Sequence, residues 1–358
     1  MTHADMTTLQ VSPRSREERR RLLVAAVATL TAGGLAACGG GGGAGGIGSG
    51  GASVGAGGSG GSGVASVDTP ASPPATGAPV TAPASGSGPG LGKSAKRGVA
   101  YDLATEQDMD ALAPGVSWWY DWGLRPNTGA PSDHATRFRM DFIPMLWGDF
   151  NDAQALAFLQ AHPEIRHLLL LNEPNLVDQA NLTPTQAAQL WPRYEAIAAR
   201  TGVRLVGPAM TWGTMPGFAD PVVWLDAFHA AYRATNGNRD PQIDYLGFHW
   251  YDYGLEGQLD RLKKYGKPFW VTEFANWHDG DGSAQIDTVE KQMAQMTELV
   301  ALCEARADVF RYAWFTGRWT QGGDPHHTSL LAANGQLTPL GSHYLRLRFE
   351  EGARISNP

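Results

Sequence analysis

Residues 167–174 read His-Leu-Leu-Leu-Leu-Asn-Glu-Pro, and this stretch says most about the fold. Four consecutive leucines are typical of a short strand that is buried in the core. A carboxylate directly after such a strand faces a steep desolvation cost, so Glu173 needs a partner or a chemical role. Pro174 disfavours the helical region for the residue before it, which predicts an extended Glu173 at the end of the strand.

Seven other apolar runs share this character, and segments with helical periodicity separate them. The eight predicted strands are residues 97–102, 115–123, 141–148, 167–174, 204–210, 245–252, 268–274 and 309–317. Eight strands that alternate with helices over about 250 residues predict an α/β fold, a single (β/α)8 TIM barrel. An open doubly wound sheet is the alternative, but no Gly-x-Gly-x-x-Gly follows the first strand.

A second carboxylate, Glu273, follows the apolar run of the seventh strand. In a closed barrel the fourth and seventh strands lie across from each other, and the chemistry lies at their carboxyl ends. Two carboxyl groups separated by about 5–5.5 Å support a retaining mechanism of glycoside hydrolysis. Glu173 and Glu273 are therefore the predicted catalytic pair, although either one could be a structural ion-pair carboxylate.

Aromatic residues gather at the same strand ends, as expected for a site that stacks sugar rings. His249 is predicted to face the sugar or to orient a glutamate, and Tyr251 to donate its hydroxyl to Glu273; both could instead be core residues. Trp191, Trp224 and Trp270 fit helix or strand packing. Six tryptophans are predicted to contact substrate: Trp119, Trp122, Trp147, Trp277, Trp314 and Trp319.

The first third of the chain has a different composition. A basic run over residues 14–21, an apolar run over 22–35 and the sequence Leu-Ala-Ala-Cys are typical of an export signal. This ending resembles a bacterial lipoprotein signal with lipidation at Cys38; a plain signal peptide and twin-arginine export are the alternatives. We predict a lipoprotein-type signal peptide over 1–37, a lipidated Cys38 with a disordered Gly/Ser/Pro-rich tether over 38–96, and the catalytic domain over 97–350. The protein would be an exported cell-envelope lipoprotein, at the outer membrane or the cell surface.

Charge and motif content narrow the partners. From residue 93 onward the chain has 23 basic and 31 acidic residues, so a nucleic acid partner is disfavoured. His326 and His327 are adjacent, but no third ligand stands at a standard spacing, and Asp279 and Asp281 fit a turn better than a calcium loop. Cys303 is expected to be a buried thiol. We expect no metal and no cofactor, a monomer, a polysaccharide substrate, and membrane contact only through the lipid.

The ordered motifs resemble glycoside hydrolase family 128. They are Gly98–Tyr101 (GVAY), Val116–Trp122 (VSWWYDW), Phe142–Gly148 (FIPMLWG), Leu171–Asn175 (LNEPN), Gly247–Tyr251 (GFHWY) and Trp270–Phe274 (WVTEF). The resemblance implies that Glu173 is the acid/base, that Glu273 is the nucleophile and that Asn172 holds the sugar 2-hydroxyl. It also implies endo-acting cleavage of β-1,3-glucan and a cis peptide bond between Trp314 and Phe315. The tether is not part of the family pattern.

Two other functions stay open at this point. One is a barrel glycosidase with another β-glycan specificity, such as β-1,4-glucan or mannan. The other is a non-catalytic, surface-tethered carbohydrate-binding protein. It would keep the tryptophans but need not bring Glu173 and Glu273 together.

Overall fold

The computed structural model describes residues 93–279, 282–319, 323–333 and 335–349. The signal peptide, Cys38 and residues 39–92 of the predicted tether lie outside the described residues. Residues 93–96 are described, and Lys93 Nζ donates to Val116 O at 2.8 Å while Ser94 and Lys96 are buried. The prediction that the disordered tether extends to residue 96 is therefore wrong. Within the described ranges, no helix is long and apolar enough to cross a membrane.

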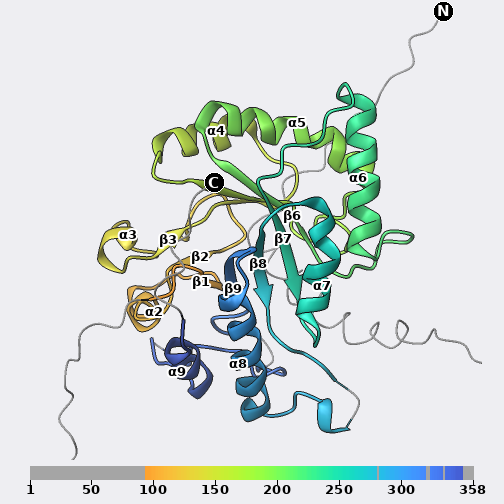
Figure 1. The fold of residues 1–358 in the computed structure, drawn as a ribbon. Coiled ribbons are helices and arrows are strands. Elements are labelled where there is room, and N and C mark those ends of the chain that lie inside the picture. The colour runs from red at the N-terminus through yellow and green to blue at the C-terminus, as the bar shows by residue number, and fades with distance from the viewer. Residues whose placement is uncertain (1–92, 280–281, 320–322, 334, 350–358) are drawn as a thin grey trace, which may run out of the picture. The chain divides into compact units, whose positions relative to one another are not determined.

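A parallel α/β sheet organises the described part of the chain (Figure 1). Its nine strands run in the order β3-β2-β1-β9-β8-β7-β6-β5-β4. Their bounds are β1 Arg97–Ala100, β2 Trp118–Tyr120, β3 Asp141–Phe142, β4 Met145–Leu146, β5 His167–Leu170, β6 Arg204–Met210, β7 Tyr245–Trp250, β8 Phe269–Phe274 and β9 Val309–Trp314. The predicted parallel α/β architecture is confirmed.

The two end strands of this sheet come from one short stretch of chain. Only Ile143 and Pro144 separate β3 from β4. Ile143 N donates to Trp119 O at 3.0 Å on one side, and Leu169 N donates to Pro144 O at 2.9 Å on the other. The sheet is therefore curled, and this one stretch bonds to β2 on one side and to β5 on the other.

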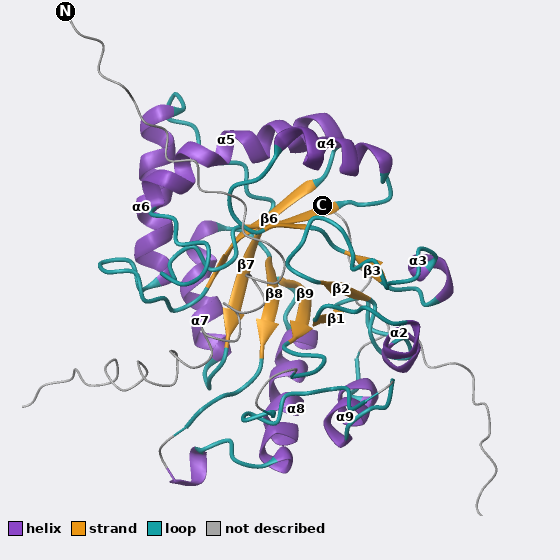
Figure 2. Ribbon diagram, turned by 180° about the vertical axis from the view of Figure 1, so that it is seen from behind, coloured by secondary structure: helices purple, strands orange, loops and turns teal. Residues whose placement is uncertain are grey.

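Helices connect the successive strands, except β3 and β4, and cover the outside of the sheet (Figure 2). They are α2 Glu106–Leu112, α3 His134–Arg137, α4 Asp152–Ala161, α5 Pro184–Thr201, α6 Pro221–Thr235, α7 Leu255–Leu262, α8 Val289–Ala305 and α9 Pro339–Arg346, with short 3-10 turns at Lys263–Tyr265 and Gly282–Ala284. The start of α5 shows why these segments are helical. Thr183 and Gln186 form a capping box, which satisfies backbone donors that the first turn leaves free.

Large aromatic side chains form a packed layer in the interior of the curled sheet. Trp118 packs edge-on against Trp270 with ring centroids 5.1 Å apart, and Trp118 stacks with Tyr120. The guanidinium of Arg311 lies 5.1 Å from the centroid of Trp270. Trp270 is a core residue as predicted, and so are Trp191 and Trp224, because all three are fully buried. These aromatic side chains and Arg311 thus form one packed layer inside the sheet.

Cys303 is also fully buried, as predicted. Burial raises the pKa of its thiol to about 12, so the thiol stays protonated at neutral pH.

The absence of a side chain at Gly98 lets β1 pack closely against the indole of Trp118, and this gives a first testable prediction. A Cβ atom at this position would lie 2.3 Å from an atom of the Trp118 indole. We expect Gly98→Ala to lower the free energy of unfolding by about 1–3 kcal/mol, as overpacking of a core does. Thermal or urea denaturation measures this.

Gly257 on α7 supplies the control for Gly98→Ala, because a Cβ there has no neighbour within 4 Å. Gly257→Ala should raise the free energy of unfolding by about 0.5–1 kcal/mol, since alanine favours the helix. Equal effects of the two substitutions would contradict the proposed packing.

Candidate active site

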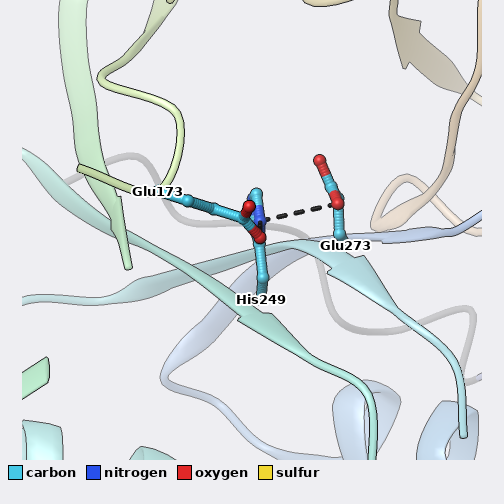
Figure 3. A group of neighbouring side chains, drawn as sticks. All are labelled: Glu173, His249 and Glu273. Carbon is cyan, nitrogen blue, oxygen red and sulfur yellow. Dashed lines mark hydrogen bonds and ion pairs between the residues drawn. The ribbon is translucent and has the colours of Figure 1, made fainter. Parts of the chain in front are cut away.

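Glu173 and Glu273 meet at the carboxyl ends of the strands, with His249 between them (Figure 3). Glu173 lies in the segment after β5, Glu273 in β8 and His249 in β7. One carboxylate oxygen of each glutamate and one ring nitrogen of His249 all lie within 4.8 Å of one another. Only 3% of Glu173 and 1% of Glu273 is exposed. The predicted proximity of the two carboxylates is confirmed.

The backbone of Glu173 is not extended, so that prediction is wrong. Its φ is 45°, and Leu171 has a φ of 51°. Left-handed conformations of non-glycine residues cost about 1–3 kcal/mol and persist where surrounding contacts enforce them. Here Glu173 N donates to Ala209 O of β6 at 2.8 Å, and the carboxylate is bonded to His249. These two contacts hold the turn that points Glu173 at Glu273.

Three neutral donors hold the carboxylate of Glu273. Tyr120 donates its hydroxyl to Oε1 at 2.7 Å, and the indole N–H of Trp122 donates to the same oxygen at 2.8 Å. Tyr251 donates its hydroxyl to Oε2, as predicted. Burial, followed by the charge of Glu273, raises the pKa of both tyrosines well above the usual value. They therefore remain protonated donors, and Glu273 is fixed in one orientation.

His249 contacts both glutamates and has no solvent exposure. Its Nδ1 lies 2.8 Å from Glu173 Oε1 and 3.5 Å from Glu273 Oε2. Burial opposes protonation of the ring, but the charges of Glu273 and Glu173 outweigh it and raise the pKa of His249. The structure thus places His249 where it orients the glutamates, one of the two predicted roles.

Burial is the main reason that the pKa of Glu173 is raised. The hydrogen bond and the charge of His249 oppose this shift, and the charge of Glu273 adds to it. The two carboxyl groups therefore differ: Glu273 receives three neutral donors, whereas Glu173 favours its protonated form. Two carboxyl groups with different environments are the usual arrangement for an acid and a nucleophile.

Asn172 is fully buried beside the pair. Its Nδ2 donates to Gln179 Oε1 at 3.0 Å. Among the described residues, its Oδ1 has no hydrogen-bond partner. This oxygen can accept a hydrogen bond from a hydroxyl group, and contact with the sugar 2-hydroxyl stays a prediction.

Trp119 and Trp314 do not lie at the site, so the prediction that they contact substrate is wrong. Trp119 is fully buried against His134 and Phe142. Trp314 is fully buried against Phe274 and Tyr344, the latter on α9.

The alternation of side chains along a strand explains both corrections. Trp118 and Tyr120 face the interior, so Trp119 between them faces outward. In the same way, Arg311 faces the interior, and Trp314, three residues later, faces the covering helices.

Phe315 takes the place that the prediction gave to Trp314. Its ring lies 5.9 Å from that of Trp122, 5.7 Å from that of Tyr251 and 5.7 Å from that of Trp277. The cis peptide bond is also one residue later than the resemblance implied, at Phe315–Thr316.

Trp122 and Trp277 have other contacts than the predicted sugar stacking. Trp122 uses its N–H to bind Glu273. Trp277 stacks on Tyr251 with ring centroids 3.7 Å apart, and on His326 with centroids 5.0 Å apart. Its flat surface is thus already occupied by other rings. Substrate contact at Trp277 through the edge of the indole, and at Trp122, stays a prediction.

Substrate contact at Trp147 and Trp319 stays a prediction. Trp147 follows β4 and is 6% exposed, and its carbonyl accepts a hydrogen bond from Asn172 N. Trp319 is half-buried, and its N–H donates to Thr328 Oγ1.

Tyr120, Phe315 and His326 are the site residues that sequence reasoning missed. A signal for Tyr120 was present, because Trp118, Tyr120 and Trp122 alternate in the sequence and a strand places alternate residues on one face. His326 and His327, considered as metal ligands, point to different partners. His326 stacks on Trp277, whereas His327 Nε2 bonds to Asp287 O.

The group of Glu173, His249 and Glu273 could also hold a metal ion by its donor set. However, His249 Nδ1 already bonds to Glu173, and both oxygens of Glu273 accept from Tyr120, Trp122 and Tyr251. An ion would have to compete with these hydrogen bonds.

Comparison with known proteins agrees with this geometry. Residues 98–344 match the family described as "Glycosyl hydrolase catalytic core". A GH128 subgroup II endo-β-1,3-glucanase from Pseudomonas viridiflava is 61% identical; the match covers 72% of this chain and 100% of that one, with a TM-score of 0.71. A GH128 subgroup I endo-β-1,3-glucanase from Amycolatopsis mediterranei, in complex with laminaritriose, is 26% identical; 70% of this chain and 98% of that one are covered, with a TM-score of 0.54.

Among curated proteins, "Alkali-sensitive linkage protein 1" of Schizosaccharomyces pombe is 25% identical over 267 residues. The match covers 70% of this chain but 44% of that protein, so the chain spans less than half of this relative's length. Because the family match covers most of the chain and the Pseudomonas enzyme is similar over its whole length, this chain belongs to glycoside hydrolase family 128.

Proposed function

We propose that the protein is a retaining endo-β-1,3-glucanase that acts by double displacement. The observation that carries this proposal is the buried pair Glu173 and Glu273, which have one oxygen of each carboxylate within 4.8 Å of the other and lie in different environments. Such a separation fits a covalent, retaining mechanism and leaves little room for the water that an inverting enzyme places between its carboxyl groups. The named activity of the two family 128 structures supports β-1,3-glucan as the substrate.

In this mechanism, Glu273 attacks the anomeric carbon while Glu173 protonates the leaving oxygen. The bond between the anomeric carbon and the leaving oxygen breaks, and a glycosyl ester of Glu273 forms. Glu173, now ionised, removes a proton from water, and the water oxygen replaces Glu273 at the anomeric carbon. The configuration is retained after two inversions. Asn172 would accept a hydrogen bond from the sugar 2-hydroxyl through Oδ1, which has no partner among the described residues.

Turnover of laminarin and curdlan, followed by NMR of the first products, tests the proposal. Release of β-anomers as the initial products supports it. Initial α-anomers would show inversion and contradict it. A panel with β-1,4-glucan and mannan decides the specificity, and binding without turnover on every glycan would indicate a carbohydrate-binding protein.

The raised pKa of Glu173 predicts the pH profile. The acid works only while protonated, and its pKa lies above the ordinary value of 4.5. Activity should therefore persist above that pH and fall as the pH rises through the raised pKa. A kcat/KM profile measures this alkaline limb. A limb that begins below pH 4.5 would contradict the assignment.

Replacement of His249 by glutamine refines the same measurement, because His249 lowers the pKa of Glu173. His249→Gln should move the alkaline limb to higher pH. An unchanged limb would mean that His249 does not influence the acid.

We further propose that the fold is a complete (β/α)8 barrel in which β3 and β4 are two halves of one interrupted strand. The backbone hydrogen bonds on both sides of Ile143 and Pro144 support this.

The chain would be exported with its signal over 1–37 and anchored by a lipid on Cys38, at the outer membrane or cell surface, and it would act as a monomer. The Leu-Ala-Ala-Cys sequence after the apolar run supports the anchor. Radiolabelled palmitate should label the wild-type protein in a bacterial host but not Cys38→Ser.

A further inference from the structure

The indole of Trp277 is covered on both faces. Tyr251 and His326 both stack on it, with interplanar angles of 20° and 21°. Within the described residues these two rings make no contact with each other, so they lie on opposite faces. Phe315 meets the indole edge-on at 5.7 Å, and only 6% of Trp277 is exposed. A tryptophan in this position supports its neighbours and does not offer a flat face to a sugar.

Tyr251, the first ring of this stack, bonds to the proposed nucleophile. Oε1 of Glu273 accepts from two donors, Tyr120 and Trp122. Oε2 accepts from Tyr251, and His249 Nδ1 lies farther off at 3.5 Å. The orientation of Oε2 thus depends mainly on where the Tyr251 ring is held. Trp277 also holds the backbone of Tyr251, because Trp277 N donates to Tyr251 O at 2.8 Å.

Gln292 fixes the other end of the stack. This side chain is fully buried on α8. Its Nε2 donates to Asn276 O and to His326 O, both at 2.7 Å. Asn276 precedes Trp277 in the chain, so one side chain ties together the two segments that carry Trp277 and His326. The spacing of the stack is therefore built into the fold.

We propose that Trp277 and His326 are positioning residues that hold the Tyr251 hydroxyl on Oε2 of Glu273. The inference rests on the proposed function, in which Glu273 is the nucleophile. A tilt of the Tyr251 ring moves its hydroxyl and releases Oε2. Misplacement of a reacting group by about 1 Å can cost about 10²-fold in rate. His326 contacts the nucleophile only indirectly, so it would affect kcat through the rings of Trp277 and Tyr251.

A double-mutant cycle on the full chain tests this proposal. His326→Leu keeps the approximate volume but removes the flat ring, and it should lower kcat on laminarin about 10-fold with little change in KM. His326→Phe restores a flat ring and should recover most of that loss. Tyr251→Phe, which removes the hydroxyl itself, should cost about 10²-fold. Because both substitutions act through one hydroxyl, His326→Leu should have no further effect in the Tyr251→Phe background.

His343→Leu is the matched control, since this histidine on α9 is half-buried and its Nε2 bonds to Thr297 Oγ1 away from the stack. It should leave kcat within about twofold of the wild type. Multiplicative losses in the cycle, or a His326→Leu variant that changes KM alone, would overturn the proposal. If His326→Leu does not fold, Trp277→Phe replaces it in the same cycle with the same expected outcomes.

The proposed function and this inference fail in different ways. A wild-type protein without activity on laminarin and curdlan would contradict the proposed function. An active wild type that loses activity with Glu273→Gln, but keeps normal kcat with His326→Leu, would contradict the positioning role alone.

Discussion

Glu273→Gln is expected to lower the rate of glucan hydrolysis by about 10⁴-fold or more, because it removes the nucleophile. The amide is nearly isosteric with the carboxylate, and its oxygen can still accept from Tyr120, Trp122 or Tyr251. Binding of laminarin oligosaccharides should therefore remain largely intact. Steady-state kinetics and isothermal titration calorimetry on the same preparation separate the two effects.

Tyr245→Phe is a control in that experiment for losses of activity that come from misfolding or from differences between protein preparations. Tyr245 is buried in the aromatic layer inside the sheet, and its ring lies 4.7 Å from that of Phe310. This variant should keep near wild-type activity. If Glu273→Gln hydrolyses laminarin normally, the assignment of the nucleophile is wrong.

Glu173→Ala should show the second largest effect, and its pattern should differ. Loss of a general acid typically costs about 10²–10⁴-fold on a substrate with a poor leaving group such as glucan. An aryl glycoside with an acidic leaving group needs little protonation, so its first step should be much less affected. The covalent intermediate should then accumulate, because no base activates the water.

Azide distinguishes this variant from one that lacks the nucleophile. In Glu173→Ala a small anion can enter the space that the side chain leaves and attack the glycosyl ester, so added azide should speed turnover and yield a β-glycosyl azide. In Glu273→Ala azide would attack from the nucleophile's side and yield the α-anomer. A β-azide from Glu273→Ala would reverse the two roles.

The strand pattern and the catalytic pair could be predicted from the sequence because both follow from local chemistry. A run of leucines that ends in Asn172 and Glu173 must be buried, and the predicted barrel topology places Glu173 opposite Glu273. The contact between Tyr251 and Glu273 followed from the same placement.

The tryptophans could not be assigned in this way, because proximity to a strand end does not say which face a side chain takes. The predictions for Trp119 and Trp314 were wrong because both side chains face outward from their strands. Side chains alternate along a strand, but which set faces the interior depends on the register of each strand. The stacking of other rings on Trp277 could not be predicted for another reason. Its partner His326 comes from a loop 49 positions later in the numbering, and no periodicity connects the two.

The backbone of Glu173 shows a third limit. Pro174 restricts the preceding residue, but tertiary contacts decide which of the remaining conformations it adopts. The hydrogen bond to Ala209 O and the contact with His249 select a left-handed turn that no local preference would predict.

The curled sheet has a consequence for how the chain is made. The first strand, β1, lies between β2 and β9, and Arg97 bonds to Tyr312 across 215 positions of sequence. Pairs so distant in sequence form slowly, and β1 cannot complete its hydrogen bonds until almost the whole domain has been synthesised. The nascent polypeptide therefore cannot complete its sheet during translation. If it is exported as we propose, folding would be completed only after the last strand has left the translocase.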